Sequence, residues 1–291
     1  MNWMKYRIVY FLISAVVIGA GIFAYLKWGL PLGVDFKGGA IIEYKVGRDF
    51  STEEAVKKIE NPSLQVYSIQ KAGENTYLIR TNTLNPYYRE KIGTVLDELT
   101  GGDAQEVRFE NVGPSIGPDL IKKTIYAIVI AASAILLWVA FQFKSFKFGV
   151  SAVLAMIHDS LVLIGSFALF GHFFAAEIDF LFVTALLTIL SFSVHDTIVV
   201  YDRIRESQRK VGGSLTELAN KATTQTMVRS LNNSFTIIFM LVALILLGGI
   251  SIKWFAIALL IGTISGTYSS PFVAVPILVT WDELQRKIKR S

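Results

Sequence analysis

The chain has 291 residues, of which 53% are hydrophobic and 18% are charged, and it carries a net charge of +5. This composition is too apolar for an ordinary soluble protein of this length, so it predicts a protein with several membrane spans. Cysteine is absent, which excludes disulfide bonds and thiolate metal sites, and the basic residues cluster beside apolar runs, which indicates membrane topology and argues against nucleic acid as a partner.

The first predicted span is an apolar run from about residue 8 to residue 28, which follows Lys5 and Arg7. A secretory signal peptide also begins with positive charge, but this run has about 20 residues and lacks a small-residue cleavage site. We therefore expect a retained transmembrane helix, with residues 1–28 forming the cytoplasmic N-terminus and the first span.

Residues 29–119 have the composition of a soluble domain. Ser51 followed by Glu54 is typical of a capped helix start, and Ala72-Gly-Glu-Asn75 is a turn between two strand-like runs. The predicted elements are a strand at 39–46, a helix at 51–59, strands at 64–71 and 76–81, a helix at 86–99 and a strand at 103–111. This βαββαβ order predicts a ferredoxin-like domain, with two helices on one face of an antiparallel sheet.

Five further apolar runs predict a polytopic α-helical protein with six transmembrane helices. They lie at about 121–143, 148–170, 178–201, 231–248 and 254–281. The expected division after the domain is residues 120–201 with the second to fourth spans, a helical loop at 202–230 interrupted by Gly212-Gly213, residues 231–281 with the last two spans, and a basic tail at 282–291.

Lysine and arginine predict the orientation of these spans. Fourteen of them lie in one alternate set of short segments, which comprises both termini, the loop after the second span and the loop at 202–230. The opposite short loops hold only Lys253, with Lys27, Lys122 and Lys123 at span borders. The positive-inside rule therefore places both termini and the helical loop in the cytoplasm and residues 29–119 outside it.

A His-Asp pair occurs in each of two adjacent spans, as His158-Asp159 and as His195-Asp196. At 1.5 Å per residue, Asp196 lies roughly 9 Å inside its span and Asp159 roughly 15 Å inside. An acid at such depth costs at least ~2.5 kcal/mol, so it predicts a functional site. On a helical wheel one polar stripe, which must face protein or water, holds His195 with Asp196 at its edge, and the other members are Thr184, Thr188 and Ser191.

The fifth span begins with a polar face that supplies a basic partner. Arg229, Asn232, Asn233 and Thr236 share this face. An arginine can extend its guanidinium along the helix, so we expect Arg229 to meet Asp196. A carboxylate that alternates between a protonated and an arginine-paired state is a proton-relay element.

Structural alternatives remain open at each of these residues. Arg229 also fits a snorkelling cation that obeys the positive-inside rule, and Asp159 also fits a structural partner of His158 or of a neighbouring hydroxyl. His158 and His195 are also compatible with packing roles. Gly262, Gly266 and Ser270 form a small-residue pattern that predicts close helix packing.

No metal or other cofactor is expected. A metal site would depend on three histidines, His158, His172 and His195, without any cysteine. The sequence contains neither a Gly-x-Ser-x-Gly nucleophile motif nor a phosphate-binding loop, so an enzyme is not predicted. The energy source must then be an ion gradient or a partner's ATPase.

Four motifs in register with six spans identify a family resemblance. They are Gly33-Val-Asp-Phe-Lys-Gly-Gly39, Val112-Gly-Pro-Ser-Ile-Gly117, His195 to Glu206, and Arg229-Ser-Leu-Asn-Asn-Ser. Over nearly its whole length the chain resembles the SecD/SecF family of the bacterial protein translocon, which is part of the resistance-nodulation-division superfamily. It differs from the common pattern at Lys37, where Thr is common, at His195, where Asn is common, and at Tyr201, where Phe is common.

The resemblance implies a six-span half-transporter in the bacterial inner membrane that pairs with SecD. It also implies work beside SecY, SecE and SecG, drawing a preprotein outward after the SecA step, with the proton-motive force as the energy source. The matching positions make Asp196 the proton-pathway carboxylate and Arg229 its basic companion. Asp159, His195 and Asn232 complete the proposed pathway, and the coupling ion, proton or sodium, stays open.

The two attachments of the domain predict hinges, because glycine and proline gather at both. The candidates are Gly33, Gly38 and Gly39 on one side and Gly113, Pro114 and Gly117 on the other. Ordinary turn chemistry is the alternative reading of these residues. Two alternative functions also remain: a scaffold that stabilises the Sec channel without conducting ions, and a small-molecule or lipid exporter of the same superfamily.

Overall fold

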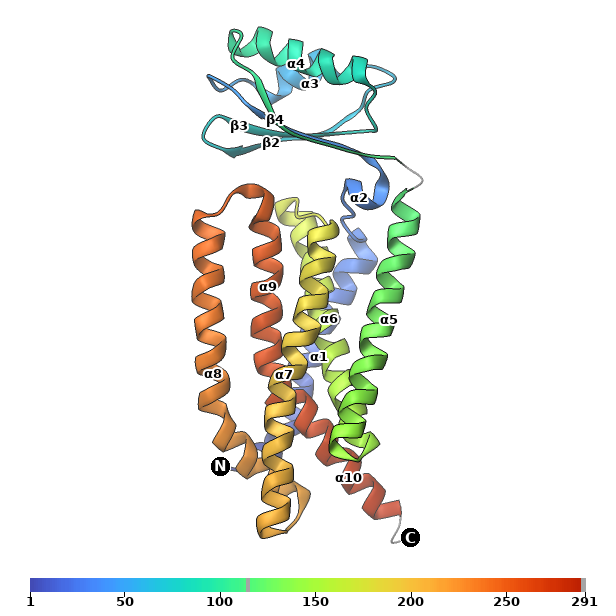
Figure 1. Ribbon diagram of the computed structural model, residues 1–291, viewed down its shortest axis with the longest axis vertical. Helices are drawn as coiled ribbons and strands as arrows, with labels where there is room; N and C mark the ends of the chain where they lie inside the picture. The colour runs from blue at the N-terminus through green and yellow to red at the C-terminus, as the bar shows by residue number, and fades with distance from the viewer. Residues whose placement is uncertain (114–115, 289–291) are drawn as a thin grey trace.

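The computed structural model describes residues 1–113 and 116–288, as a bundle of long helices with a small α+β domain at one end (Figure 1). Six helices are long and apolar enough to cross a membrane, which confirms the predicted number of spans. They are α1 (Arg7–Trp28), α5 (Ile116–Phe143), α6 (Phe146–Phe174), α7 (Phe180–Val211), α8 (Leu215–Leu247), and a last span made of α9 (Ile250–Ser269), a π-helical segment (Ser270–Ala274) and α10 (Val275–Ile288). A 3-10 turn at Trp3–Tyr6 precedes α1.

The predicted helical loop at 202–230 consists of the ends of two spans. Helix α7 runs without a break to Val211, and α8 begins at Leu215. Ser214 caps α8 in a reciprocal capping box with Glu217, which satisfies two backbone donors at the helix start. The two helices thus form a hairpin that extends beyond the apolar part of the bundle, at the end that carries both chain termini (Figure 1).

The α+β domain has the predicted ferredoxin-like fold. Its elements are β1 (Gly39–Lys45), α3 (Thr52–Ile59), β2 (Val66–Gly73), β3 (Thr76–Thr81), α4 (Pro86–Thr100) and β4 (Gln105–Val112), in an antiparallel sheet of order β2-β3-β1-β4. Helices α3 and α4 lie on the face of the sheet that points away from the bundle (Figure 1). Ile42, Ile59, Ile79 and Leu96 are fully buried between the helices and the sheet. The opposite face of the sheet is therefore the one that meets the bundle.

Four of the predicted hinge residues are buried: Gly33, Gly38, Gly39 and Gly117. Gly113 is partly exposed, with open space where a Cβ atom would lie, and Pro114 is outside the described residues. A short helix that the sequence did not predict, α2 (Val34–Lys37), lies between Gly33 and Gly38. A Cβ atom at Gly117 would come within 2.0 Å of the Phe36 carbonyl oxygen, so glycine is needed there for a close backbone approach.

Close helix packing occurs where the sequence predicted it and also at an unpredicted site. Gly262 and Gly266 both face α7, where a Cβ atom would meet Ile189 at 2.1 Å and Ser193 at 3.4 Å respectively. The unpredicted contact joins α1 and α6, because a Cβ atom at Gly21 would lie 2.7 Å from the Cα atom of Gly165. These contacts hold the last span against α7 and the first span, α1, against α6.

Candidate functional site

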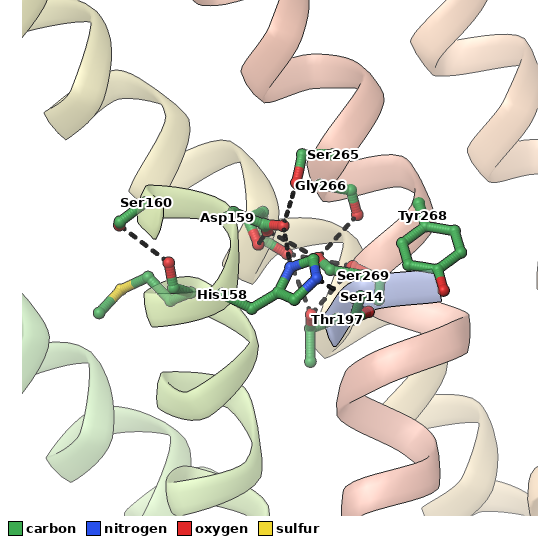
Figure 2. A network of polar contacts seen from close by, with 12 residues as sticks. Ser14, His158, Asp159, Ser160, Thr197, Ser265, Gly266, Tyr268 and Ser269 are labelled. Carbon is green, nitrogen blue, oxygen red and sulfur yellow. Dashed lines mark hydrogen bonds and ion pairs between the residues drawn. The ribbon is translucent and has the colours of Figure 1, made fainter. Parts of the chain in front are cut away.

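A fully buried carboxylate, that of Asp159, lies at the centre of a polar network inside the bundle (Figure 2). Ser193 and Ser269 each donate a hydrogen bond of 2.6 Å to its Oδ2 atom. Ser265 donates a hydrogen bond of 2.6 Å to Oδ1, and the Nδ1 atom of His158 lies 3.0 Å from the same oxygen. The network therefore joins α6, α7 and the last span through one side chain.

This arrangement compensates the cost of a charge in the bilayer. An unpaired buried carboxylate is strongly disfavoured, whereas hydrogen bonds to an ionised oxygen are about twice as strong as neutral ones. Each oxygen of Asp159 has two partners, so the ionised form is fully hydrogen-bonded. A serine hydroxyl can rotate to accept as well as donate, so the same three serines can also accommodate a protonated carboxyl.

The imidazole of His158 extends the network to the first span. Its Nε2 atom lies 3.0 Å from the Ser14 hydroxyl of α1, and its side chain is buried. A cavity of about 320 Å³ between α1, α6 and α9 reaches His158, Ser14 and Ser265, with Val162 and Ile264 among its apolar walls. His158 therefore lies between the carboxylate and a space at the bundle surface.

The last span changes its helical geometry beside this site. The π-helical segment Ser270–Ala274 begins one residue after Ser269, and such segments occur frequently at functional sites. The Ser270 hydroxyl lies 3.0 Å from the Thr197 hydroxyl and donates a 3.3 Å hydrogen bond to the carbonyl oxygen of Ser193. These hydroxyls continue the polar interior along α7 toward Asp196.

Asp196 is buried, but its partner differs from the prediction. It accepts a hydrogen bond from Ser230 of α8. The expected contact with Arg229 is wrong for this structure: Arg229 is exposed and makes no ion pair with any residue in the described parts of the chain. Consecutive helical residues point about 100° apart, so when Ser230 faces Asp196 its neighbour Arg229 faces outward.

Arg229 instead lines a cavity of about 690 Å³ between α7 and α8, near the end of the bundle that carries the termini. Asp202, Glu206 and Arg203 lie along the same cavity. Glu206 is paired with Arg203 at 2.5 Å and with Lys210 at 2.6 Å. The cavity is therefore polar and opens beside the α8 helix turn that contacts Asp196.

The predicted polar stripe of α7 faces away from this chain's interior. Thr184, Thr188, Ser191 and His195 are all exposed, as is Asn232 on α8. The interior face of α7 carries Ser193, Asp196 and Thr197 instead. His195 is therefore not part of the Asp159 network, although it precedes Asp196 directly.

The network serines were missed by the sequence reasoning. Ser265 and Ser269 are four residues apart in the last span, so they share one helix face, and Ser14 is a polar residue in the apolar first span. This spacing was the available signal. It did not distinguish carboxylate donors from small residues that only pack.

Two family models match the chain. The model described as "Protein export membrane protein SecD/SecF, C-terminal" matches residues 91–284, and the "SecD/SecF GG Motif" model matches residues 29–49. The matched residues include all members of the Asp159 network except Ser14, and also the segment that enters the α+β domain.

Named relatives agree with these matches. The chain is 38% identical to the protein translocase subunit SecF of Thermobaculum terrenum, over 96% of this chain and 93% of the relative. It is 36% identical to the SecF subunit of Anaerolinea thermophila, over 97% of this chain and 94% of the relative. It is 30% identical to the SecDF subunit of Bacillus subtilis, over 94% of this chain but only 37% of that longer relative.

A solved structure has the same fold. The crystal structure of SecDF, a translocon-associated membrane protein from Thermus thermophilus, superposes with a TM-score of 0.84 and 28% sequence identity. The match includes 97% of this chain and 39% of that chain. The present chain thus corresponds to about two fifths of the SecDF polypeptide.

Proposed function

The chain belongs to the SecD/SecF family of protein export membrane proteins, and we propose that it uses a proton gradient to assist polypeptide export as one half of a unit with SecD. The observation that carries the proposal is the Asp159 network. One titratable side chain there contacts α6, α7 and the last span, so a change in its charge alters the contacts between three spans. A proton crossing 100 mV supplies about 2.3 kcal/mol, which is enough to change such contacts.

Within this proposal, two carboxylates act in sequence, Asp159 on α6 and Asp196 on α7. Asp159 holds the proton deep in the bundle. Asp196 exchanges the proton nearer the end of the bundle that carries the termini. The Ser193, Thr197 and Ser270 hydroxyls lie between them. His158 extends this pathway, because its imidazole contacts both Asp159 and Ser14. Arg229, His195 and Asn232 contribute from the exposed face of α7 and α8.

The proposed partner, SecD, covers that exposed face. Polar side chains within a membrane span face protein or water, and Ser191, His195 and Asn232 have no cover from this chain. The SecDF relatives are single chains of which this protein matches about two fifths, so in them a longer polypeptide accompanies the matched part. The partner would close the bundle around Arg229 as well.

The proposed setting is the bacterial inner membrane, with both termini in the cytoplasm and the α+β domain outside. The distribution of lysine and arginine supports this orientation. In that setting the unit works beside SecY, SecE and SecG, after the SecA step, on a preprotein that leaves the channel next to the α+β domain.

The function is tested by export into vesicles that hold the Sec channel, SecA and SecD, with and without this chain. We expect an imposed proton gradient to increase preprotein export only when the chain is present. A scaffold would increase export equally with and without the gradient, and that result would exclude the proposed coupling.

The partner surface is tested by replacing Thr188, Ser191 and His195 together by leucine. We expect association with SecD to weaken by roughly tenfold, or about 1.4 kcal/mol, because a polar face that the partner matches becomes apolar. The measurement is co-purification of the two subunits at graded concentrations. The control replaces the exposed Tyr126 and Trp138 of α5 by leucine. The assignment would be contradicted if both variants lost association with SecD equally, or if neither lost it.

A further inference from the structure

The loop that joins α6 to α7, residues 175–179, connects the two helices of the proton site to the α+β domain. Asp159 lies on α6 and Asp196 on α7, so this loop follows any displacement of one helix against the other. Its distance from Asp159 is roughly 23 Å along the helix. It is also the place where the bundle touches the domain through polar contacts.

Main-chain contacts tie the loop to the segment that enters the domain. The Ile178 amide donates a 2.7 Å hydrogen bond to the carbonyl oxygen of Pro31, and the Gly33 amide donates a 2.8 Å hydrogen bond to the carbonyl oxygen of Ile178. The Asp35 carboxylate accepts a 2.8 Å hydrogen bond from the Phe180 amide, at the start of α7. The entry segment therefore moves with the loop.

One ion pair ties the loop directly to the sheet. The Nε atom of Arg80 on β3 lies 2.9 Å from the Oε2 atom of Glu177, and a second guanidinium nitrogen donates a 3.1 Å hydrogen bond to Gln70 of β2. The side chains are only 12% and 27% exposed, so the pair is better shielded from water than an ordinary surface pair. Burial raises the pKa of Glu177, against the opposing effect of Arg80.

The boundary between the sheet and the bundle is hollow beside this pair. A cavity of about 550 Å³ lies there, lined by residues of both parts, including Arg108, Glu110 and Trp254. The cavity interrupts the packing between the sheet and the bundle. A displacement at the Arg80–Glu177 pair is therefore not resisted by a continuous packed interface.

We propose that Arg80 and Glu177 are positioning residues that transmit a displacement of α6 against α7 to the α+β domain through the loop 175–179. This inference rests on the proposed proton coupling and adds the route by which the domain responds to it. It differs from the predicted hinge mechanism, because the domain is driven at a docked contact beside the attachments and not by free rotation about glycines.

The test uses the natural absence of cysteine in the chain. Arg80→Cys and Glu177→Cys are introduced together and joined by a short, reducible bis-methanethiosulfonate cross-linker, in the vesicles with SecD described above. We expect the reduced double-cysteine protein to lose the gradient-dependent part of export at least tenfold, because the ion pair is absent, and to keep the ATP-driven part unchanged. Cross-linking should restore the gradient-dependent part, because it rejoins the loop to the sheet, and reduction of the cross-link should remove it again in the same sample.

A matched control places the same cross-linker inside the domain. Arg89 of α4 and Glu106 of β4 also form an ion pair, so Arg89→Cys with Glu106→Cys should keep its gradient dependence both before and after cross-linking. If the reduced Arg80→Cys, Glu177→Cys protein keeps full gradient dependence, the transmission route is wrong while the proposed function stands. If the wild-type chain shows no gradient dependence, the proposed function fails first.

A charge exchange covers the case in which the cross-linker does not reproduce the geometry of the ion pair. Arg80→Glu alone should lose most gradient-dependent export, and Arg80→Glu with Glu177→Arg should recover it, because the pair is restored with reversed polarity. Absence of recovery, with both proteins folded at wild-type yield, would overturn the assignment of these residues.

Discussion

Replacing Asp159 by asparagine is expected to reduce gradient-dependent export to the level seen without a gradient. Asparagine has nearly the same shape but cannot take up or release a proton. Its amide nitrogen meets hydroxyls that can rotate to accept, so the polar contacts around it persist. We expect a loss of stability of only about 1–3 kcal/mol, and the ATP-driven part of export should remain.

The measurement compares preprotein export with and without an imposed gradient for the wild type and the variant. Asp119→Asn is the matched control, because Asp119 is an exposed carboxylate paired with Lys123 at the start of α5. Full gradient dependence in Asp159→Asn would show that the buried carboxylate is structural, which is the alternative that the sequence left open.

The second large effect is expected from Asp196→Asn. Asp196, on α7, is the second buried carboxylate of the bundle, so the variant should lower gradient-dependent export at least tenfold, or by about 1.4 kcal/mol in the free energy of the coupled step. The contact with Ser230 joins α7 to α8 in this arrangement. Export assays under the same gradient provide the measurement.

Two variants on α8 separate the observed partner of Asp196 from the predicted one. Ser230→Ala should lower the melting temperature of the purified chain, because it leaves a buried carboxylate without its donor. Arg229→Gln should leave the melting temperature unchanged, since Arg229 is exposed. If Arg229→Gln lowered the melting temperature and Ser230→Ala did not, the arginine would be the structural partner of Asp196.

The sequence predicted the α+β domain well because its signals are local. Ser51 and Asn85 cap the two helices of this domain, each accepting a hydrogen bond from a backbone amide three residues on. Turns that contain glycine separate neighbouring elements, so the order of strands and helices can be predicted from the sequence. The six spans were equally easy to predict from the sequence, since each is an apolar run of sufficient length.

The face of α7 that points inward could not be read from polarity alone. The exposed stripe with Thr184, Thr188 and His195 is at least as polar as the interior face with Ser193 and Thr197. A bundle that pairs with another membrane protein needs polar groups on both faces. Helical periodicity finds such faces but does not say which of them belongs to the chain's own interior.

The serines around Asp159 illustrate a second limit. Serine in a membrane helix commonly bonds to its own backbone or allows close packing, as Ser160 and Ser166 do here. Only the fold shows that Ser193, Ser265 and Ser269 converge on one carboxylate. The contact of Arg80 with Glu177 joins residues 97 positions apart in the chain, and no local pattern marks it.

Infrared difference spectroscopy of the reconstituted protein tests most directly whether Asp159 carries the coupled proton. On acidification, we expect the wild type and Asp119→Asn to gain absorption of protonated carboxyls in an apolar environment, and Asp159→Asn to lack the component of Asp159 while it keeps that of Asp196. An Asp159→Asn spectrum identical to that of the wild type would contradict the assignment of the coupled proton to this carboxylate.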